Sequence, residues 1–275
     1  MEDIKLIAFD LDGTLLNSQK DLTPKTLEIL QRASEMKIEL VPATGRFWGV
    51  VPECVRDLNF IRYALTLNGA EVYDVENKKS LAKFEIPPER ALKMAQAFED
   101  IDGIIYDCII EGQGYMRRDF YEKVSDFMVG QWQTKLVKDG RKPVDDFEAV
   151  IKNSKGIQKM QIFTLDKKLR EDLLNSLPYV FPKSFFTSSI PNNIEINDST
   201  ANKGNALKFL ADHLNIKIEN TMAFGDGLND LSMIRTAGIG VAMENSCEEL
   251  LGVADSVTLS CDDDGVAEGI IKFCF

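Results

Sequence analysis

The sequence predicts an α/β fold whose parallel sheet is built from both ends of the chain and is interrupted by an inserted α+β module. Two observations lead to this prediction. Near both ends of the 275-residue chain, short apolar, β-branched runs alternate with amphipathic stretches, as in a parallel sheet with helices on both faces. In the middle of the chain this alternation gives way to paired strands with short turns, mixed with helices.

The first part of the chain predicts a βαβ series. Thr23 and Pro24 are a favourable N-cap and first-turn pair, so we expect a helix to begin there. Apolar runs and helical spacing predict the other elements, which are strands at 4–9, 38–41 and 63–67 and a helix at 47–58. This order is that of one half of a Rossmann-like sheet.

After Asn68 the order of elements changes. Four side chains recur at i, i+3, i+4 and i+7 and predict a helix with one buried face: Ala91, Met94, Ala95 and Phe98. Around it we expect a hairpin of 71–74 with 82–86, a second hairpin of 103–110 with 115–118, helices at 120–132, 144–152 and 168–177, and a strand at 158–165. Hairpins mixed with helices indicate an α+β module.

The alternation of strands and helices then resumes. We expect strands at 194–196 and 221–224, a helix with Leu207, Leu210, Ala211 and Leu214 on one face, a helix from about 229, and a closing strand and helix near 255 and at 265–273. We therefore assign residues 1–84 and 188–275 to the core and residues 85–187 to the insert, with each boundary placed to within several residues.

Composition and charge exclude several classes of protein. The chain has 44% hydrophobic and 28% charged residues, as in globular rather than disordered proteins. Its net charge of −12 opposes polyanions, so we expect no nucleic-acid partner. The five cysteines form no C-x-x-C pair, which suits a reducing compartment. No apolar run is long enough to span a bilayer, and the first residues are acidic where a signal peptide is basic, so we expect a cytoplasmic protein.

The first chemical signal is a pair of aspartates directly after the first predicted strand. In extended backbone, side chains two residues apart share a face, so we expect Asp10 and Asp12 to point together, while Gly13 permits a tight turn. Ligands bind at the carboxyl ends of strands in open α/β sheets. A plain D-G turn with a surface carboxylate explains the same residues equally well. This motif alone leaves both interpretations open.

A second acidic cluster, residues 225–230, follows another predicted strand. By itself it is compatible with a glycine-rich turn in which a polar residue caps a helix. If both clusters lie at one sheet edge, Asp10, Asp12 and Asp226 converge. At separations of about 4 Å, each pair of carboxylates would repel by about 4 kcal/mol at an effective dielectric constant of about 20. We therefore predict a divalent cation, and specifically Mg²⁺, which accepts carboxylate, water and phosphate oxygens.

Two basic elements follow other predicted strands. Thr44, Gly45 and Arg46 end the second strand and offer a hydroxyl, a backbone N–H that can face an anion, and a guanidinium. Lys203 opens a helix, where its charge opposes the preference of the helix dipole for anionic groups. A bound anion beside Lys203 would offset this conflict, but a solvated lysine in a first helical turn is a common alternative.

Together these motifs resemble the haloacid dehalogenase-like (HAD) phosphohydrolase superfamily. The similarity is carried by DLDGT at 10–14, ATGR at 43–46, NKG at 202–204 and GDGLND at 225–230. The ATGR form, LNGA at 67–70, the place of the insert and DGVA at 264–267 are similar to the Cof-type branch with a type IIB (C2B) cap. The resemblance covers nearly the whole chain. It implies a Rossmann-like core with an inserted cap domain that selects the substrate.

The resemblance also implies roles for individual residues. Asp10 is the implied nucleophile that becomes an aspartyl phosphate, and Asp12 is the implied general acid and base. The implied Mg²⁺ ligands are the Asp10 carboxylate, the Asp12 backbone carbonyl and Asp226. The remaining implied roles are phosphate binding by Thr44, Gly45, Lys203 and Asn229, support of the site by Asp230, and contacts to the rest of the substrate by Arg46 and Asn68.

Some polar residues receive a structural interpretation. His213, the only histidine, lies away from every motif, so we expect no histidine-based catalysis. Arg117 and Arg118 could supply cationic contacts from the cap, but we favour a solvated strand end.

These observations predict a Mg²⁺-dependent phosphatase of small phosphorylated metabolites, with sugar phosphates as the first candidate substrates and phosphorylated cofactors as the second. No membrane and no obligate protein partner are implied. Two alternatives stay open, a phosphotransferase or phosphomutase that uses the same aspartyl phosphate and a non-catalytic phosphate-sensing module. A sensing module has no need of an acid and base two residues after the phosphorylated aspartate, so Asp12 favours an enzyme.

Overall fold

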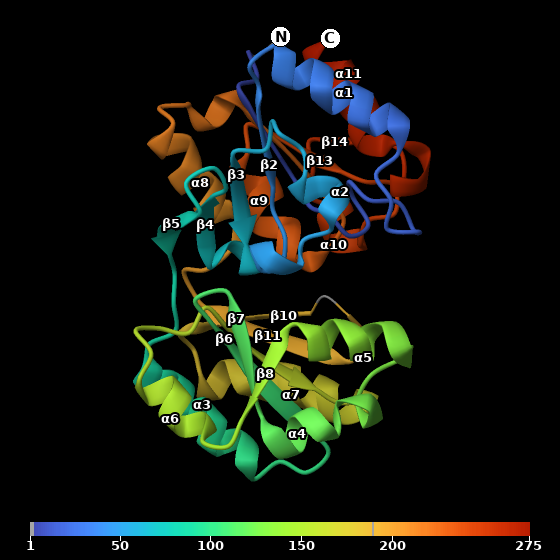
Figure 1. The fold of residues 1–275 in the computed structure, drawn as a ribbon. Helices are drawn as coiled ribbons and strands as arrows, with labels where there is room; N and C mark the ends of the chain where they lie inside the picture. The colour runs from blue at the N-terminus through green and yellow to red at the C-terminus, as the bar shows by residue number, and fades with distance from the viewer. Residues whose placement is uncertain (1–2, 189) are drawn as a thin grey trace. The chain divides into compact units, whose positions relative to one another are not determined.

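A computed structural model describes residues 3–188 and 190–275 of the chain. Met1, Glu2 and Ser189 fall within the predicted core and lie outside the described residues. The chain divides into two compact units, one made of Met1–Lys83 with Asn202–Phe275 and the other of Phe84–Ala201. In Figure 1 the first unit carries the blue and the orange to red parts of the chain, and the second carries the green to yellow part.

The first unit is built on a five-stranded sheet in the order β14-β13-β12-β1-β2. Its strands are β1 (Leu6–Phe9), β2 (Glu39–Pro42), β12 (Thr221–Gly225), β13 (Ile239–Ala242) and β14 (Ser256–Val257). Every neighbouring pair is parallel, so all five strands end at the same edge of the sheet. Strands β1 and β12, from opposite ends of the sequence, are direct neighbours, with Phe9 beside Phe224.

Helices cover both faces of this sheet (Figure 1). On one face, α1 (Pro24–Glu35) and α11 (Gly265–Cys274) pack on Ile7 and Phe9 of β1. On the other, α8 (Lys203–His213), α9 (Leu231–Thr236) and α10 (Glu248–Leu251) pack with Leu6 and Ala8 of β1. The side chains of β1 therefore alternate between two apolar layers, and the strand is buried on both sides, as expected for a parallel sheet.

The same unit carries a small antiparallel sheet made of β3 (Tyr63–Thr66), β4 (Glu71–Asp74) and β5 (Lys79–Lys83). We expected 63–67 as a third parallel strand, which is wrong in part. A single parallel bridge joins Leu65 to Ala43, while β3 otherwise pairs antiparallel with β4. The cause is the turn at η2 (Leu67–Gly69), where three successive residues have positive φ of 54°, 60° and 89° and reverse the chain.

The predicted helix over 47–58 is interrupted. The structure has η1 (Trp48–Val50) followed by α2 (Glu53–Arg56). Pro52 stands between them, and it has no backbone N–H to continue a helix across this point. Three further short helices complete the first unit: η4 (Ile218–Asn220), η5 (Leu228–Asp230) and η6 (Cys261–Asp263).

The second unit is an α+β module built on a six-stranded sheet in the order β10-β11-β9-β6-β7-β8. The strands are β6 (Ile105–Ile110), β7 (Gln113–Arg117), β8 (Arg141–Val144), β9 (Lys159–Phe163), β10 (Ser184–Thr187) and β11 (Asn193–Asp198). One face packs on α3 (Pro88–Glu99), α6 (Phe147–Lys152) and α7 (Lys167–Val180). In α3 the buried residues are the four that the helical spacing predicts, which confirms that helix.

Three details of the second unit correct the sequence prediction. Residues 194–196, expected as a parallel core strand, lie in β11, which pairs antiparallel with β9 and β10 inside the insert. Val144, expected in a helix, ends the unpredicted strand β8, whose sequence RKPV has valine as its single strand-forming residue and whose Pro143 is tolerated at a sheet edge. The predicted helix over 120–132 is divided into α4 (Arg118–Glu122), η3 (Val124–Asp126) and α5 (Gly130–Asp139).

Two more strands, β10 and β13, were also not predicted. Their sequences are SFFT and IGVA. Across the part of the chain that the structure describes, every helix is too short or too polar to cross a bilayer.

Candidate active site

Two loops at the carboxyl edge of the parallel sheet carry the predicted aspartates. β1 leads directly into Asp10, and β12 leads through Gly225 into Asp226. The loops contact each other, because the Thr14 hydroxyl donates a hydrogen bond of 2.8 Å to Asp226 Oδ1. Gly13, at φ +96°, lies so close to this carboxylate that a Cβ atom there would stand 2.6 Å from Asp226 Oδ2. Glycine is therefore required by both the turn and the close approach.

Lys203 lies at the centre of the site and is fully buried. Its ammonium group contacts Asp10 Oδ1 at 2.5 Å and Asp230 Oδ1 at 2.6 Å. The Asp230 carboxylate also accepts hydrogen bonds of 3.0 Å from the backbone N–H groups of Asp226 and Gly227. Asp230 thus links Lys203 to the loop that follows β12. A supporting role for Asp230 is what the family resemblance implied.

The start of α8 is fixed by close packing. The Asn202 side chain caps the helix by accepting a hydrogen bond of 2.8 Å from Asn205 N. Gly69, at φ +89°, packs so tightly on this turn that a Cβ atom would lie 2.3 Å from the Asn202 carbonyl oxygen. A larger residue at Gly69 would displace the helix start and with it Lys203.

The electrostatics of this group favour a cation. Burial is the main cause that raises the pKa of Asp10; Lys203 opposes the rise, and the nearby charges of Asp230 and Asp226 add to it. Burial, followed by the charge of Asp230, raises the pKa of Asp226 to about 6. Burial alone would lower the pKa of Lys203, but Asp10 and Asp230 raise it, so the ammonium form is retained.

The residues present fit a magnesium ion. Carboxylate oxygens of Asp10, Asp226 and Asp230 lie within 4.8 Å of one another. When all groups are ionised, three carboxylates and one ammonium leave two uncompensated negative charges, which a divalent cation would balance. Asp10 and Asp226 are the better ligands, since both Asp230 oxygens already accept hydrogen bonds. Hard oxygen donors of this kind suit Mg²⁺.

The Asp12 side chain lies outside this carboxylate group. We expected Asp10 and Asp12 to point together, but the backbone already turns at Leu11, and the two carboxylates bind different partners. Arg46 binds the Asp12 carboxylate through two parallel hydrogen bonds of 2.8 and 2.9 Å, and Lys20 approaches it at 3.0 Å. Burial alone would raise the pKa of Asp12, but Arg46 and Lys20 together lower it.

The loop after β2 lies beside the site. Thr44 is buried, and its hydroxyl accepts a hydrogen bond of 3.2 Å from Arg46 N. Asn68 is buried too, and its backbone N–H donates to the Thr44 carbonyl at 3.0 Å. The Asn229 amide donates to Asn68 Oδ1 at 3.2 Å. These bonds join the loop after β2 to the loop after β12, with Gly45 between Thr44 and Arg46 in the sequence.

The sequence analysis did not identify Lys20 as a partner of Asp12. Lys20 lies in a loop, where no helical or strand periodicity indicates which residues its side chain contacts. His213 stands at the end of α8, where its ring stacks on Phe209 with centroids 6.2 Å apart.

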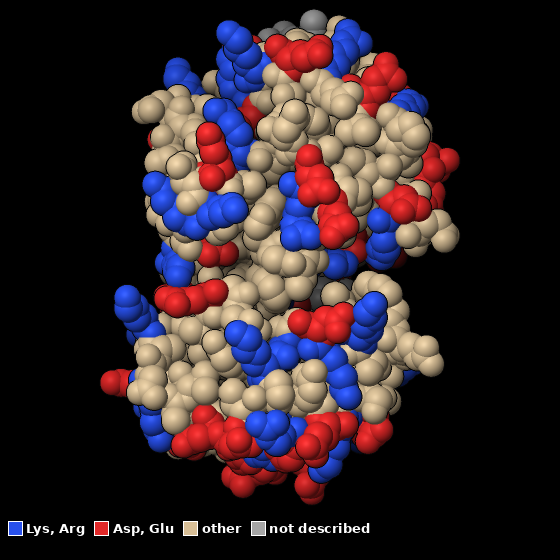
Figure 2. All heavy atoms as spheres, in the orientation of Figure 1, with Lys and Arg blue, Asp and Glu red and all other residues tan. Residues whose placement is uncertain are grey.

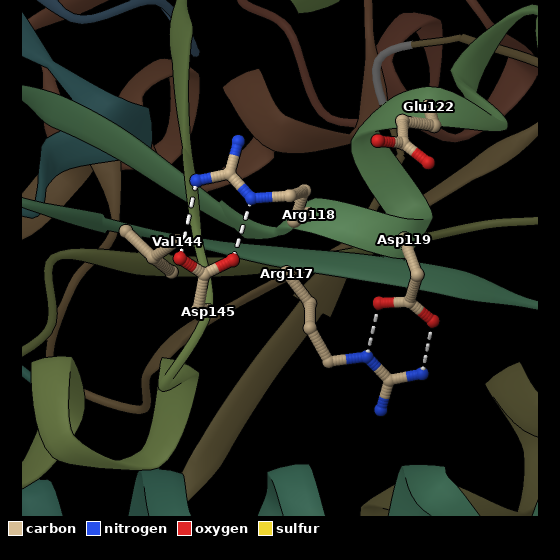
Figure 3. A pocket seen from close by; sticks show the side chains of 6 residues that line it. All are labelled: Arg117, Arg118, Asp119, Glu122, Val144 and Asp145. Carbon is tan, nitrogen blue, oxygen red and sulfur yellow. Dashed lines mark hydrogen bonds and ion pairs between the residues drawn. The ribbon is translucent and has the colours of Figure 1, made fainter.

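Arg117 and Arg118 line a pocket of about 310 Å³ in the second unit (Figure 3). Asp119 binds the Arg117 guanidinium at 2.6 and 2.7 Å, and Asp145 binds that of Arg118 at 2.5 and 3.2 Å. These carboxylates cancel the positive charge that an anionic ligand would need. On the face shown in Figure 2, basic and acidic side chains are likewise interspersed rather than gathered by sign.

Comparison with known proteins shows which family and which structures the chain is similar to. Residues 7–270 match the family model of haloacid dehalogenase-like hydrolases. The chain is 32% identical to "Phosphatase YwpJ" of Bacillus subtilis (strain 168), over 96% of this chain and 98% of that protein. It is 29% identical to "5-amino-6-(5-phospho-D-ribitylamino)uracil phosphatase YcsE" of the same organism, over 98% and 95%.

Among solved structures, the chain is similar to one described as the "HAD Subclass IIB Sugar Phosphatase BT4131". The TM-score is 0.79 at 26% identity, and the match covers 98% of each chain. The resemblance drawn from the four motifs is thereby confirmed, as is the α/β core with an inserted module.

Proposed function

The chain belongs to the haloacid dehalogenase-like hydrolases, and we propose that within this family it is a Mg²⁺-dependent phosphatase that acts on phosphomonoesters of small metabolites. The observation that carries this proposal is the group in which Lys203 is buried between Asp10 and Asp230, beside the carboxylate of Asp226. Such a group offers a nucleophile, a fixed positive charge and a metal-binding edge in one place. The matched relatives named as phosphatases support the same reaction.

The first half of the reaction transfers the phosphoryl group to Asp10. A carboxylate oxygen of Asp10 forms a bond to phosphorus while the bond from phosphorus to the ester oxygen breaks, and Asp12 gives its proton to that leaving oxygen. Lys203 holds Asp10 in place and places a positive charge beside the transferred group. The products of this half are the alcohol, the aspartyl phosphate and ionised Asp12.

The second half restores the enzyme. Asp12 accepts a proton from water, the water oxygen bonds to phosphorus, and the bond from phosphorus to Asp10 breaks. Arg46 and Lys20 favour the ionised form of Asp12 that this half needs. In the first half, the negative charge of a bound phosphate dianion would offset the positive charges of Arg46 and Lys20. This would favour the protonated form of Asp12.

Asp10 and Asp226 would hold the magnesium ion, together with the backbone carbonyl of Asp12. The ion would neutralise the repulsion between the phosphate and the carboxylates. Thr44, the backbone of Gly45 and Asn229 are the proposed phosphate contacts, and Asn68 holds Asn229 toward them. Arg46 is bound to Asp12, so we place it at the leaving-group side of the phosphate.

We further propose that sugar phosphates are the first substrates to test, followed by phosphorylated cofactors and their precursors, in the cytoplasm. One relative is named for a sugar phosphate activity and another for a substrate that carries its phosphate on a ribityl chain, which is a sugar alcohol. The insert is the proposed substrate-selecting domain, because it forms a compact unit of its own while the first unit carries the proposed chemistry.

Hydrolysis of p-nitrophenyl phosphate and of a panel of sugar phosphates, with Mg²⁺ present, tests the function. We expect turnover that stops when EDTA removes the metal and returns when Mg²⁺ is restored. Asp10→Asn should lose at least about 10³-fold in turnover, because the nucleophile is removed. Asp145→Asn, which removes an exposed, ion-paired carboxylate in the insert, is the matched control and should be unaffected. Unchanged turnover by Asp10→Asn would refute the proposal, and transfer of phosphate to an added alcohol in preference to water would favour the phosphotransferase alternative.

A further inference from the structure

The carboxylate of Asp12 is bound by two cations rather than one. Arg46 Nε contacts Oδ2 at 2.8 Å, Arg46 Nη2 contacts Oδ1 at 2.9 Å, and Lys20 Nζ contacts Oδ1 at 3.0 Å. A carboxylate has about four acceptor positions, two on each oxygen. Three of them are filled here, two on Oδ1 and one on Oδ2. The position that stays available is on Oδ2.

Arg46 is held at both ends, so its position is defined by the fold. Its backbone N–H donates to the Thr44 hydroxyl at 3.2 Å, and its carbonyl accepts from Leu67 N at 3.0 Å. At the far end, Nη1 donates to the Val50 carbonyl at 3.3 Å. The guanidinium therefore presents a fixed pair of donors to Asp12.

Lys20 belongs to a loop that is fastened on both sides. The Asn17 side chain accepts hydrogen bonds from Gln19 N and Asp21 N at 3.0 and 2.9 Å, while Lys20 N donates to the Asn17 carbonyl at 2.9 Å. Ser18 N donates to Asp262 Oδ1 at 2.7 Å, which anchors the loop to a distant part of the chain. Lys20 has a φ of 67°, a conformation that costs energy for a residue with a side chain.

We propose that Lys20 is a positioning residue for Asp12. By filling the second acceptor position of Oδ1, it leaves Oδ2 as the oxygen that exchanges the proton with the leaving group and then with water. Arg46 fixes the plane of the carboxylate, and Lys20 decides which of its two oxygens serves as the acid. This assignment rests on the proposed function, in which Asp12 protonates the leaving oxygen.

A positioning role of Lys20 can be distinguished from a role in phosphate binding. The effect of losing the positioning role depends on the leaving group, whereas the effect of losing a phosphate contact does not. p-Nitrophenol is a stronger acid than phenol, so its anion leaves phosphorus without help from a proton, whereas phenolate leaves poorly unless it is protonated. The quantity kcat/KM covers the steps up to departure of the leaving group. A defect in the placement of Asp12 therefore lowers kcat/KM for phenyl phosphate far more than for p-nitrophenyl phosphate.

The test compares Lys20→Met with wild type on these two esters, with Mg²⁺ present. We expect kcat/KM for phenyl phosphate to fall by about tenfold, a part of the 10²- to 10⁴-fold that acid–base catalysis contributes, and that for p-nitrophenyl phosphate to stay within about twofold. Lys20→Arg should recover most of the loss, since it keeps a cation at Oδ1. Lys25→Met, which removes another half-exposed lysine paired with a carboxylate, Glu268, should change neither value.

Other outcomes overturn the assignment. An equal fall for both esters would place Lys20 in phosphate binding, and no fall for either would make it a surface ion pair. A thermal unfolding midpoint equal to that of wild type would show that Lys20→Met is folded. If Lys20→Met did not fold, Lys20→Gln would take its place, with the same expected difference between the two esters. If wild-type protein hydrolysed neither ester, the proposed function itself would be wrong, and this assignment would fall with it.

Discussion

The residues of the site are of two kinds. Some carry the charges that the proposed reaction uses, and others hold those charged side chains in position. Asp10 and Asp226 carry negative charge that burial makes costly, as their raised pKa values show. Lys203 compensates part of that charge, and Asp230 anchors Lys203 without needing to touch a substrate. Under the proposed function, these buried charges would be offset when a cation and a phosphate bind.

At this scale, substitution of Asp12 should divide the reaction into its two halves. Asp12→Ala removes the base for the water step but leaves the nucleophile, so p-nitrophenyl phosphate should still phosphorylate Asp10. We expect a trapped phosphoenzyme, with turnover lower than wild type by about 10²- to 10⁴-fold. Mass spectrometry after acid quenching would detect the added phosphate. Absence of that species, with turnover lost, would remove Asp12 from the proposed role.

Among the elements, the sheet of the insert contains a buried ion pair, Asp107 with Arg141, that takes no part in the proposed chemistry. Asp107 of β6 is fully buried, and Arg141 of β8 donates from Nε to its Oδ2 at 2.8 Å. Burial is the main cause that raises the pKa of Asp107, while the charge of Arg141 opposes the rise. Asp107 Oδ1 has no hydrogen-bond partner among the described residues. The pair is thus costly to bury and still more costly to break.

We therefore expect Arg141→Met to destabilise the insert by about 3 to 5 kcal/mol, because it leaves the buried carboxylate of Asp107 without its ion-pair partner. The free energy of unfolding in urea measures this loss. The double variant Arg141→Met with Asp107→Leu should recover much of the stability, since neither half of this ion pair is then left buried without its partner. A single variant as stable as wild type would show that Asp107 is already neutral in the native state.

Helix caps and apolar periodicity explain which helices and strands could be predicted from the sequence. α1, α3, α8 and β12 have clear caps or periodicity, and the structure contains them. β11 has equally clear apolar residues, but its sequence contains nothing that distinguishes a parallel core strand from an antiparallel strand of the insert. Pairing partners are chosen by tertiary contacts, so the assignment of 194–196 to the core failed.

Across the whole molecule, the thiol pKa of each of the five cysteines is raised. For each of them, burial is the main cause that raises the thiol pKa, in the case of Cys274 to about 11. A thiol with a raised pKa stays protonated at pH 7 to 8, and only the thiolate is nucleophilic. This agrees with a mechanism that uses a carboxylate as its nucleophile.

Alkylation by iodoacetamide should accordingly be slow at pH 7.5, even at the exposed Cys54, and should rise as the pH increases above about 9, near the ordinary range of thiol pKa values. Peptide mass spectrometry over time would give the rate at each site, with glutathione as the reference thiol. Phosphatase activity should survive the treatment. Labelling of Cys54 as fast as glutathione at pH 7.5 would contradict this expectation.

The sequence by itself determined the family, the parallel α/β core and the presence of an inserted module, because residue types with special backbone or chemical roles stand directly after apolar strands at 10–14, 43–46 and 225–230. Only the tertiary structure decided that Lys203 joins Asp10 to Asp230, that Asp12 turns away to Arg46 and Lys20, and that β11 pairs within the insert. The physical reason is that short-range patterns fix what each segment can form, while hydrogen bonds and ion pairs between separate segments depend on how those segments fold together.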